Sequence, residues 1–186
     1  MNFPFKFQIQ KFKEVDSTNT FARLAADNGA PDGSVFVADH QTTGRGQQGR
    51  KWSSPPGENL LFSLLLRPLM TPQKATMITQ IACQSVGSVL KEKYGIESTT
   101  KWPNDILVDG KKICGILVES SSSAAELQDV IIGIGLNVNA VPEKSEVPSA
   151  VCMKDLGGKA LNRDKILKDL LDQLEKDIAP IYGSPS

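Results

Sequence analysis

The chain has 186 residues, of which 40% are hydrophobic and 23% are charged. These values are typical of a globular protein with one buried core, and we expect residues 1–186 to form a single domain. Basic and acidic residues balance at 21 each, so the overall charge favours neither a nucleic-acid nor a membrane partner. No apolar run reaches membrane-spanning length, and the N-terminus lacks the apolar core of a signal peptide.

The cysteines and the histidine exclude several kinds of site. Cys83, Cys114 and Cys152 are odd in number and lie far apart, without a C-x-x-C pair. This pattern argues against a disulfide framework or a zinc site and predicts a reducing, cytoplasmic location. The single histidine, His40, has no G-x-S-x-G motif beside it, so we interpret it as a residue at the end of a strand rather than a catalytic base.

The first third of the chain predicts a strand, a helix and two more strands. Alternating residues at 5–12 predict a half-buried strand. Asp16 or Ser17 caps a helix with an apolar stripe, and Gly29 ends it. Apolar runs predict the two further strands at 34–41 and 59–68.

The longest predicted helix spans 71–95, where Thr71 caps, Pro72 takes the first turn and Gly95 closes. Extended segments follow at 98–108, 111–120 and 129–139. Asp109–Gly110 joins the first two as a hairpin. The remaining predictions are a loop at 120–126, a final helix at 163–178 and a tail at 182–186.

Hairpin-linked strands with helices between some of them predict the fold class. We expect an α+β, two-layer fold: a mixed, largely antiparallel sheet covered by helices on one face, rather than alternating βαβ units.

The stretch GRGQQGRKW, residues 44–52, resembles two nucleotide-binding fingerprints but lacks their context. G-x-G-x-x-G and Walker A loops both need a following helix. Here Pro55 and Pro56 follow, and then a strand. What remains is a flexible, basic, glycine-rich loop at 42–58, whose backbone N–H groups and arginines are suited to binding an anion. A solvated surface turn is the alternative.

Five blocks occur in order: STN at 17–19, QTTGRGQQGRKW at 41–52, KWPND at 101–105, GKKICGILVE at 110–119 and GIGLNVN at 133–139. This succession resembles the catalytic domain of biotin protein ligases over roughly residues 10–140. The resemblance implies a class II synthetase-like biotin/lipoate ligase fold.

It also implies an ATP-dependent biotin–[biotin carboxyl carrier protein] ligase. Biotin and ATP would form biotinyl-5′-AMP, and a lysine of a carrier domain, in acetyl-CoA carboxylase or a related carboxylase, would accept the biotin. Mg²⁺ is expected to arrive with ATP and to be held mainly by phosphates, because no cluster of Asp, Glu and His suggests a protein metal cage.

The family motifs assign roles to particular residues. Positive charge must stabilise two anions that meet at phosphorus, which makes Arg45 and Lys112 the catalytic candidates. The expected biotin-binding residues are Ser17, Thr18, Asn19, Gln41, Gly44, Arg45, Gly46, Gln47, Lys112 and Gly115. The expected ATP-binding residues are Arg45, Arg50, Trp52, Lys101 and Asn137.

Three of the singled-out residues have alternatives. Trp52 is expected either to pack over biotin or adenine, or to be an ordinary core residue. Trp102, before a proline, is predicted to be core. Gly115 suits either a close approach to the backbone or a bulge.

Asn104 and Asp105 are expected either to orient Lys101 or a metal-bound water, or only to turn the chain.

The chain departs from the family at three points. Many relatives have a second arginine at the position of Gln47, so we expect faster release of biotinyl-AMP here. No winged helix-turn-helix precedes the STN block, which argues against a DNA partner. An SH3-like domain that often follows the last helix is either absent or cut away.

Two other functions and one assembly stay open. A lipoate–protein ligase shares the broad fold, but the ordered blocks favour biotin. A non-catalytic module that binds biotin or biotinyl-AMP is the second alternative, disfavoured by Arg45 and Lys112. Relatives include monomers and dimers that pair sheet edges, so a homodimer is one of two expected states.

Overall fold

The computed structural model describes residues 6–68, 70–71, 75–123, 126–142 and 149–183. Within these residues, seven strands form one sheet in the order β1-β2-β3-β7-β6-β5-β4. Only the β1–β2 pair is parallel, which confirms the mixed, largely antiparallel sheet. The strands are β1 Gln8–Val15, β2 Ser34–Gln41, β3 Leu60–Leu66, β4 Thr99–Lys101, β5 Asp105–Val108, β6 Lys111–Ser123 and β7 Glu126–Leu136.

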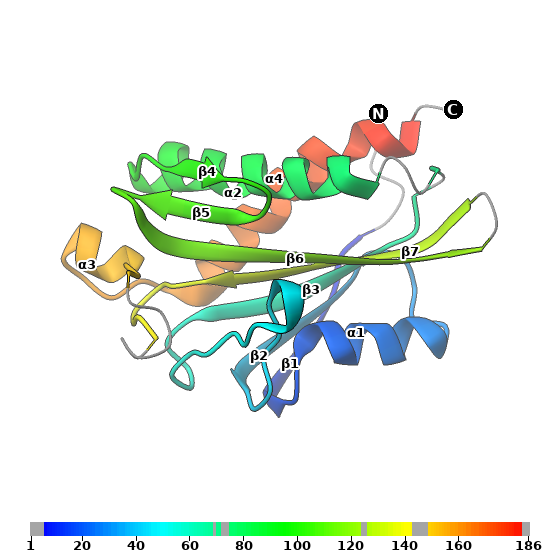
Figure 1. Ribbon diagram of the computed structural model, residues 1–186, viewed down its shortest axis with the longest axis horizontal. Coiled ribbons are helices and arrows are strands. Elements are labelled where there is room, and N and C mark those ends of the chain that lie inside the picture. Colours follow the sequence, from blue (N-terminus) through cyan, green and yellow to red (C-terminus); the bar gives the residue numbers. More distant parts are fainter. Residues whose placement is uncertain (1–5, 69, 72–74, 124–125, 143–148, 184–186) are drawn as a thin grey trace.

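Helices pack on both faces of this sheet, but unequally. The long helices α2 (Ala75–Tyr94) and α4 (Arg163–Gly183) cover one face, and α1 (Thr18–Asp27) lies on the other (Figure 1). A short helix, α3 (Met153–Gly157), was not predicted. The residue pattern predicts helices on one face only; α1 adds partial cover to the second face.

The alternation of side chains along the strands divides the core into two parts. Val35 and Val37 of β2 join the larger cluster beneath α2 and α4. Phe36, between them, points to the opposite face and packs with Ala22 and Ala26 of α1. Successive strand residues face opposite sides, so each covering layer buries its own set of apolar side chains.

Most predicted elements are confirmed, with shifted bounds. The strand predicted at 5–12 runs instead from Gln8 to Val15 and is mostly exposed, because β1 is an edge strand; Phe5 lies outside the described residues. α2 begins at Ala75, and the predicted start at Pro72 also lies outside them. The hairpin turn at Asp109–Gly110 is confirmed, with positive φ at both residues.

The predicted loop at 120–126 is wrong for its described residues. β6 continues to Ser123 and β7 starts at Glu126, with Ser120 opposite Val130 and Ser121 opposite Asp129. A run of serines reads as a loop, but ladder pairing uses backbone groups and tolerates any side chain. The predicted tail is also too long, because α4 continues through Tyr182, whose hydroxyl donates to Asp32 Oδ1 at 3.0 Å.

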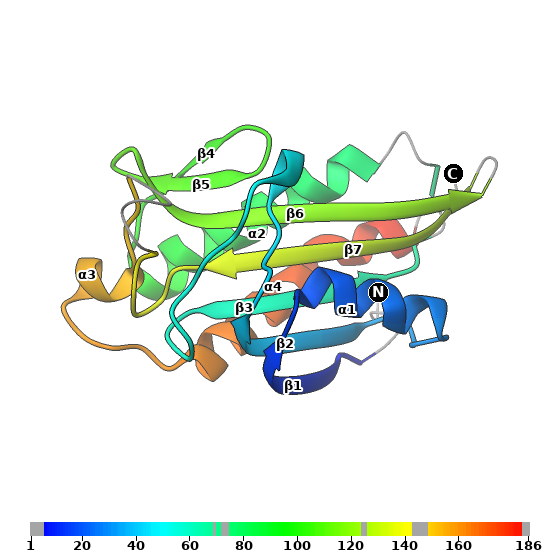
Figure 2. The ribbon, with the colours of Figure 1, turned by 60° about the horizontal axis from the view of Figure 1, so that its bottom comes forward.

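The face that α2 and α4 leave open carries the 42–58 loop. This segment, between β2 and β3, crosses in front of β7 and β6 (Figure 2). The first turn of α1, the end of β2 and the middle of β6 and β7 therefore meet beneath one loop.

Candidate active site

A cavity of about 600 Å³ lies between the 42–58 loop, the first turn of α1 and the sheet. All of the predicted site residues except Gly44 line it. They are Ser17, Thr18, Asn19, Gln41, Arg45, Gly46, Gln47, Arg50, Trp52, Lys101, Lys112, Gly115 and Asn137. Segments far apart in the sequence thus converge on one cavity, although each residue's role toward a ligand stays a prediction.

The loop above the cavity is a small hairpin. Gly46 N–H donates to Arg50 O at 2.7 Å, and Trp52 N–H donates to Gly44 O at 2.9 Å. Its tip is a short 3-10 turn at Gln47–Gly49. Gly44 lies at the base, where a Cβ would come within 2.3 Å of the Trp52 carbonyl oxygen. Gly44 therefore allows the two sides of the hairpin to approach each other.

Trp52 lies against a pair of glycines. Gly115 of β6 and Gly135 of β7 are cross-strand partners, and a Cβ on Gly135 would lie 2.4 Å from Trp52 Cε2. A Cβ on Gly115 would lie 2.7 Å from Trp52 Cζ3. Gly115 thus permits a close approach, as one alternative predicted, but the approaching group in this structure is the indole. Gly115 pairs regularly with both neighbouring strands, so the bulge alternative is wrong.

Hydrogen bonds join the first turn of α1 to the end of β2. Gln41 Oε1 accepts from the Thr18 N–H at 2.7 Å and from the Thr18 hydroxyl at 3.0 Å. Ser17 occupies the N-cap position, but its side chain makes no capping hydrogen bond. Because Gln41 satisfies a first-turn N–H instead, the Ser17 hydroxyl is left available to a ligand.

Asn19 is held more tightly than any sequence pattern suggested. It is 4% exposed, and its Oδ1 accepts from Ser63 Oγ at 2.6 Å. Its Nδ2 donates to Glu119 Oε2 at 2.8 Å, and a Cβ on Gly133 would collide with Oδ1 at 2.0 Å. Ser63, Glu119 and Gly133 were all missed; a polar residue inside the apolar run LLFSLLL was the only available signal for Ser63.

Lys112 lies near the start of β6, on the face of the sheet that borders the cavity. Its Nζ lies 2.7 Å from Asp105 Oδ1 and 5.3 Å from the centroid of the Trp52 ring. The carboxylate contact is a close ion pair without hydrogen-bond geometry, since Oδ1 has no hydrogen-bond partner among the described residues. Asp105 therefore pairs with Lys112, and the turn at 102–104 fits the alternative in which Asn104 turns the chain. Asn104 is buried, with Nδ2 donating to Ile116 O at 2.8 Å.

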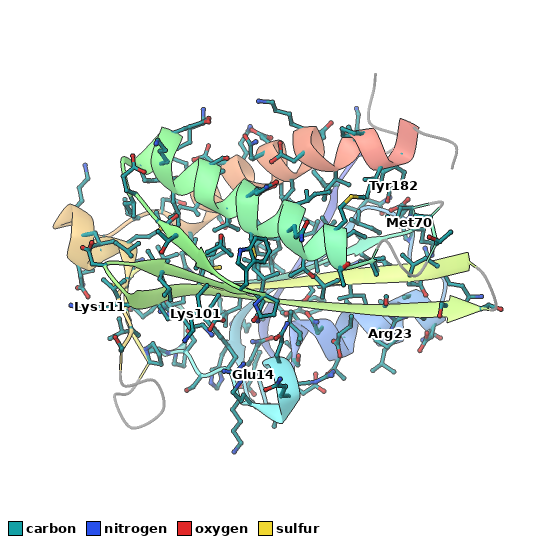
Figure 3. The ribbon with its side chains drawn as sticks, turned by 45° about the horizontal axis from the view of Figure 1, so that its top comes forward. Glu14, Arg23, Met70, Lys101, Lys111 and Tyr182 are labelled. Atoms are coloured by element: carbon teal, nitrogen blue, oxygen red, sulfur yellow. The ribbon has the colours of Figure 1, made fainter. Side chains whose placement is uncertain are left out.

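The cationic end of the cavity lies toward one end of the molecule. Lys101 and Lys111 lie at the end near α3, whereas Met70, Arg23 and Tyr182 lie toward the opposite end (Figure 3). Lys101 faces the cavity but Lys111, next to Lys112, does not line it. Alternation along β6 thus directs only one of the two adjacent lysines into the site.

Asn137 follows β7 and is 1% exposed. Its Nδ2 donates to Val151 O at 3.2 Å, while Oδ1 is buried with no hydrogen-bond partner in the described part of the chain. Trp52 Nε1 is likewise buried with no hydrogen-bond partner among the described residues. A buried polar atom without a partner costs about 1–3 kcal/mol, so the cavity presents one acceptor and one donor that a ligand can satisfy.

The cysteines and the acidic residues of the described chain form neither a reactive thiol nor a metal-binding cluster. The cysteines are free and buried, and burial raises the pKa of Cys83 to about 11 and that of Cys114 further still. Both thiols are therefore protonated at neutral pH and poor nucleophiles. Within the described ranges, no group of three His, Cys, Asp or Glu could hold a metal ion.

Trp102 and His40 do not line the cavity. Trp102 is 58% exposed, so its predicted core position is wrong: it lies in the turn between β4 and β5 at the open edge of the sheet. His40 lies near the end of β2, with Nδ1 3.0 Å from Glu14 Oε2, and does not line the cavity. None of the helices in the described residues is long and apolar enough to cross a membrane.

Known proteins match both the sequence and the fold. Residues 12–137 match the model of the biotin/lipoate A/B protein ligase family. The chain is 38% identical to the bifunctional ligase/repressor BirA of Bacillus subtilis, over 87% of this chain and 51% of that protein. It is 34% identical to the biotin–[acetyl-CoA-carboxylase] ligase of Mycobacterium tuberculosis, over 92% of this chain and 64% of that one.

Among solved structures, the biotin protein ligase of Aquifex aeolicus, in complex with biotin and ATP, superposes with a TM-score of 0.76. It is 32% identical and covers 94% of this chain and 71% of that one. The chain spans about half the length of the Bacillus relative. The family model covers more than half of the chain, and the cavity lies within the matched segment for all but a few residues. The chain belongs to the biotin/lipoate A/B protein ligase family.

Proposed function

We propose that this chain is an ATP-dependent biotin–protein ligase. The observation that carries the proposal is a single cavity that joins an uncharged polar end to a cationic end. Thr18, Asn19 and Gln41 form the first end, and Lys101 and Lys112 contribute to the second. Asn19 reaches β6 at Leu117 O, about 17 Å of strand away from Lys112.

The uncharged end suits the ureido head group of biotin. A urea needs both donors and acceptors in fixed positions, and hydroxyl and amide side chains supply both. Gln41 and Asn19 are pinned by their own hydrogen bonds, so their remaining groups are preorganised. The Aquifex relative, solved in complex with biotin and ATP, supports biotin as the ligand.

The cationic end suits the reaction centre. In the first step a biotin carboxylate oxygen attacks the α-phosphorus of ATP, the bond to the β-phosphate bridging oxygen breaks, and pyrophosphate leaves. Lys112 would lower the repulsion between the two anions and stabilise the charge that builds at phosphorus. Arg45, the other catalytic candidate, pairs with Glu119 beside Asn19 in this structure, so its contribution requires its side chain to move toward Lys112. Asp105 fixes the Lys112 ammonium at 2.7 Å while leaving its other N–H groups free.

In the second step a lysine amine of a carrier domain attacks the carbonyl carbon of biotinyl-5′-AMP. An amide bond forms, the carbon–oxygen bond to phosphate breaks, AMP leaves, and the amine releases its proton. The name of the Mycobacterium relative supports a biotin carboxyl carrier domain of acetyl-CoA carboxylase, or of a related carboxylase, as the acceptor. A homodimer and a cytoplasmic location are part of the same proposal.

Mg²⁺ is the metal we expect with ATP. The cavity offers such an ion Asn137 Oδ1, which is buried without a hydrogen-bond partner in the described residues, whereas Asp105 Oδ1 is paired with Lys112. A hard oxygen ligand of this kind, together with phosphate oxygens, suits Mg²⁺. The ion would neutralise phosphate charge during pyrophosphate departure.

The test is biotin-dependent exchange of radiolabelled pyrophosphate into ATP, with lipoate as the comparison acid. We expect exchange with biotin and none above background with lipoate. Exchange with lipoate would favour the lipoate ligase alternative. Biotin binding by calorimetry without exchange of either acid would favour a non-catalytic binding module.

A further inference from the structure

Asn59 lies directly before β3, one residue ahead of the ladder that pairs β3 with β7. No sequence motif assigns it a role, and it is not among the residues that line the cavity. Its side chain is polar yet fully buried. A buried amide needs hydrogen-bond partners for both its oxygen and its nitrogen, so the partners of Asn59 identify what it holds in place.

The side-chain oxygen of Asn59 binds the segment that follows β7. Oδ1 accepts from the Val138 N–H at 2.8 Å and from the Ala140 N–H at 3.3 Å. The Asn139 N–H between them donates to Glu58 O at 3.1 Å. Residues 58 and 59 therefore satisfy three consecutive backbone N–H groups beyond the end of the ladder, and the Asn59 side chain accepts two of the three.

The Asn59 amide is itself fixed on two sides. Nδ2 donates to Ser54 Oγ at 3.0 Å, and the backbone carbonyl accepts from Arg163 Nη1 at 3.2 Å. Arg163 also pairs with Asp39 of β2 at 2.8 Å. Because a backbone N–H can only donate, the side-chain oxygen must face Val138, which excludes the flipped amide. Asn59 is therefore held in one orientation.

The segment that Asn59 binds begins directly after Asn137. Nδ2 of Asn137 donates to Val151 O at 3.2 Å and to Lys112 O at 3.4 Å. Its Oδ1 is the buried atom without a partner in the described residues, on a residue that lines the cavity. The next residue, Val138, is buried in the main core. The Val138 N–H belongs to the peptide group that links the two residues, so Asn59 holds the backbone of Asn137 in place.

We propose that Asn59 is a positioning residue for the cationic end of the cavity. By holding the peptide group between Asn137 and Val138, it keeps the Asn137 oxygen directed at a bound nucleotide. The identity of that ligand rests on the proposed function, whereas the hold on the Val138 N–H concerns the ligand-free chain. Asn59 has no contact with the uncharged polar end, so the affinity for nucleotide should depend on it and the affinity for biotin should not.

The test replaces Asn59 by alanine and measures two affinities by calorimetry. One probe is biotin alone. The other is the α,β-methylene analogue of ATP with Mg²⁺ and saturating biotin, because this analogue cannot release pyrophosphate. We expect Asn59→Ala to weaken binding of the analogue about tenfold, the scale of one or two lost hydrogen bonds, and to leave the dissociation constant of biotin unchanged. Unchanged affinity for the analogue, or an equal loss for both ligands, would overturn the proposal.

Asn139→Ala is the matched control in the same segment. Asn139 Oδ1 accepts from the Leu161 N–H at 2.8 Å, and its Nδ2 donates to Leu161 O at 3.0 Å. It does not line the cavity. Losing these two bonds should lower the melting temperature without changing the affinity for the analogue. A tenfold loss of that affinity in Asn139→Ala as well would mean that any weakening of the segment has this effect, against a specific role for Asn59.

Two further measurements separate positioning from stability. In an Asn137→Ala background, Asn59→Ala should add nothing to the loss of affinity for the analogue; additive losses would show that Asn59 does not act through Asn137. In ligand-free protein, NMR measures the exchange of single amide hydrogens with solvent. Asn59→Ala should speed exchange at Val138 and Ala140 about tenfold and leave that of Ile134 in β7 unchanged. Equal exchange at Val138 in wild type and variant would refute the hold on the peptide group.

Failure of the proposed function would look different. If the wild type bound neither biotin nor the analogue, the ligand assignment would fall with that function, and amide exchange alone would decide whether Asn59 holds the peptide group. Should Asn59→Ala fail to fold, Ser54→Ala removes the acceptor of Nδ2 and must weaken binding of the analogue about threefold with biotin affinity unchanged. Full affinity for the analogue in Ser54→Ala would then contradict the proposal.

Discussion

The two faces of β6 and β7 differ sharply although they share the same backbone. On the face beneath α2 and α4, β7 presents Val130, Ile132, Ile134 and Leu136, all buried in the main core. On the other face the alternating residues are Ile131, Gly133 and Gly135, followed by Asn137. Apolar side chains on one face pack into the core and stabilise the fold. On the other face, glycines leave room for Asn19 and Trp52 to lie against the backbone.

The same strand segment therefore serves both stability and binding. The direction of each side chain decides which of the two it affects. A β-strand directs neighbouring residues to opposite sides, so substitutions one residue apart should have different consequences. On the core face they should lower the free energy of unfolding, and on the glycine face they should lower activity.

The largest expected effect is on the core face. Leu170 of α4 is fully buried, and Leu170→Ala should lower the free energy of unfolding by about 2–5 kcal/mol. Chemical denaturation monitored by circular dichroism measures it. Leu156→Ala, at a leucine that is 41% exposed, is the control and should change stability little. An equal loss in both variants would contradict the assignment of the core face.

Lys112→Ala tests the cationic end of the glycine face. It should reduce biotin-dependent pyrophosphate exchange by two or more orders of magnitude, equivalent to ~3 kcal/mol for one electrostatic donor. Lys111→Ala is a matched control, because the neighbouring lysine is exposed and does not line the cavity. Undiminished exchange in Lys112→Ala would remove that residue from the mechanism.

Gln47→Arg tests the loop above that face. Gln47 lines the cavity, and a second cation there should slow the release of biotinyl-AMP by about tenfold, or ~1.4 kcal/mol. Pulse-chase measurement of the bound intermediate gives the rate, with Gln48→Arg at the adjacent position as control. An unchanged release rate would mean that the charge at position 47 does not govern retention.

Much of this arrangement was predictable from residue patterns. Apolar periodicity predicted β2, β3 and the face of α2, and the ordered blocks contain most of the residues that line the cavity. Apolar periodicity depends only on neighbouring residues, and a motif is recognised directly from its residue types and their spacing. Arg45 and Lys112 were visible in this way because they stand in the blocks at 41–52 and 110–119.

The missed residues depend on contacts between distant segments. Ser63 and Glu119 matter because Asn19 lies against them, and the pair Asn19–Glu119 is separated by 100 residues. The exposure of Trp102 depends on β4 being an edge strand, which the order of strands in the sheet decides. The length of the β6–β7 hairpin was missed because strand pairing uses backbone groups, and the serine side chains there show no apolar alternation that would predict a strand.

The central claim is that the glycine face serves binding while the core face serves stability, and Gly135→Ala against Ile132→Val tests it most directly. The new methyl at Gly135 would meet Trp52 Cε2 at 2.4 Å and must lift the indole, which stands on the loop. We expect biotin-dependent exchange to fall about tenfold, ~1.4 kcal/mol, with little change in the free energy of unfolding.

Ile132 is fully buried in the main core. Ile132→Val should lower the free energy of unfolding by about 0.5–1.5 kcal/mol, with exchange per folded molecule unchanged. Full exchange activity in Gly135→Ala would contradict the claim.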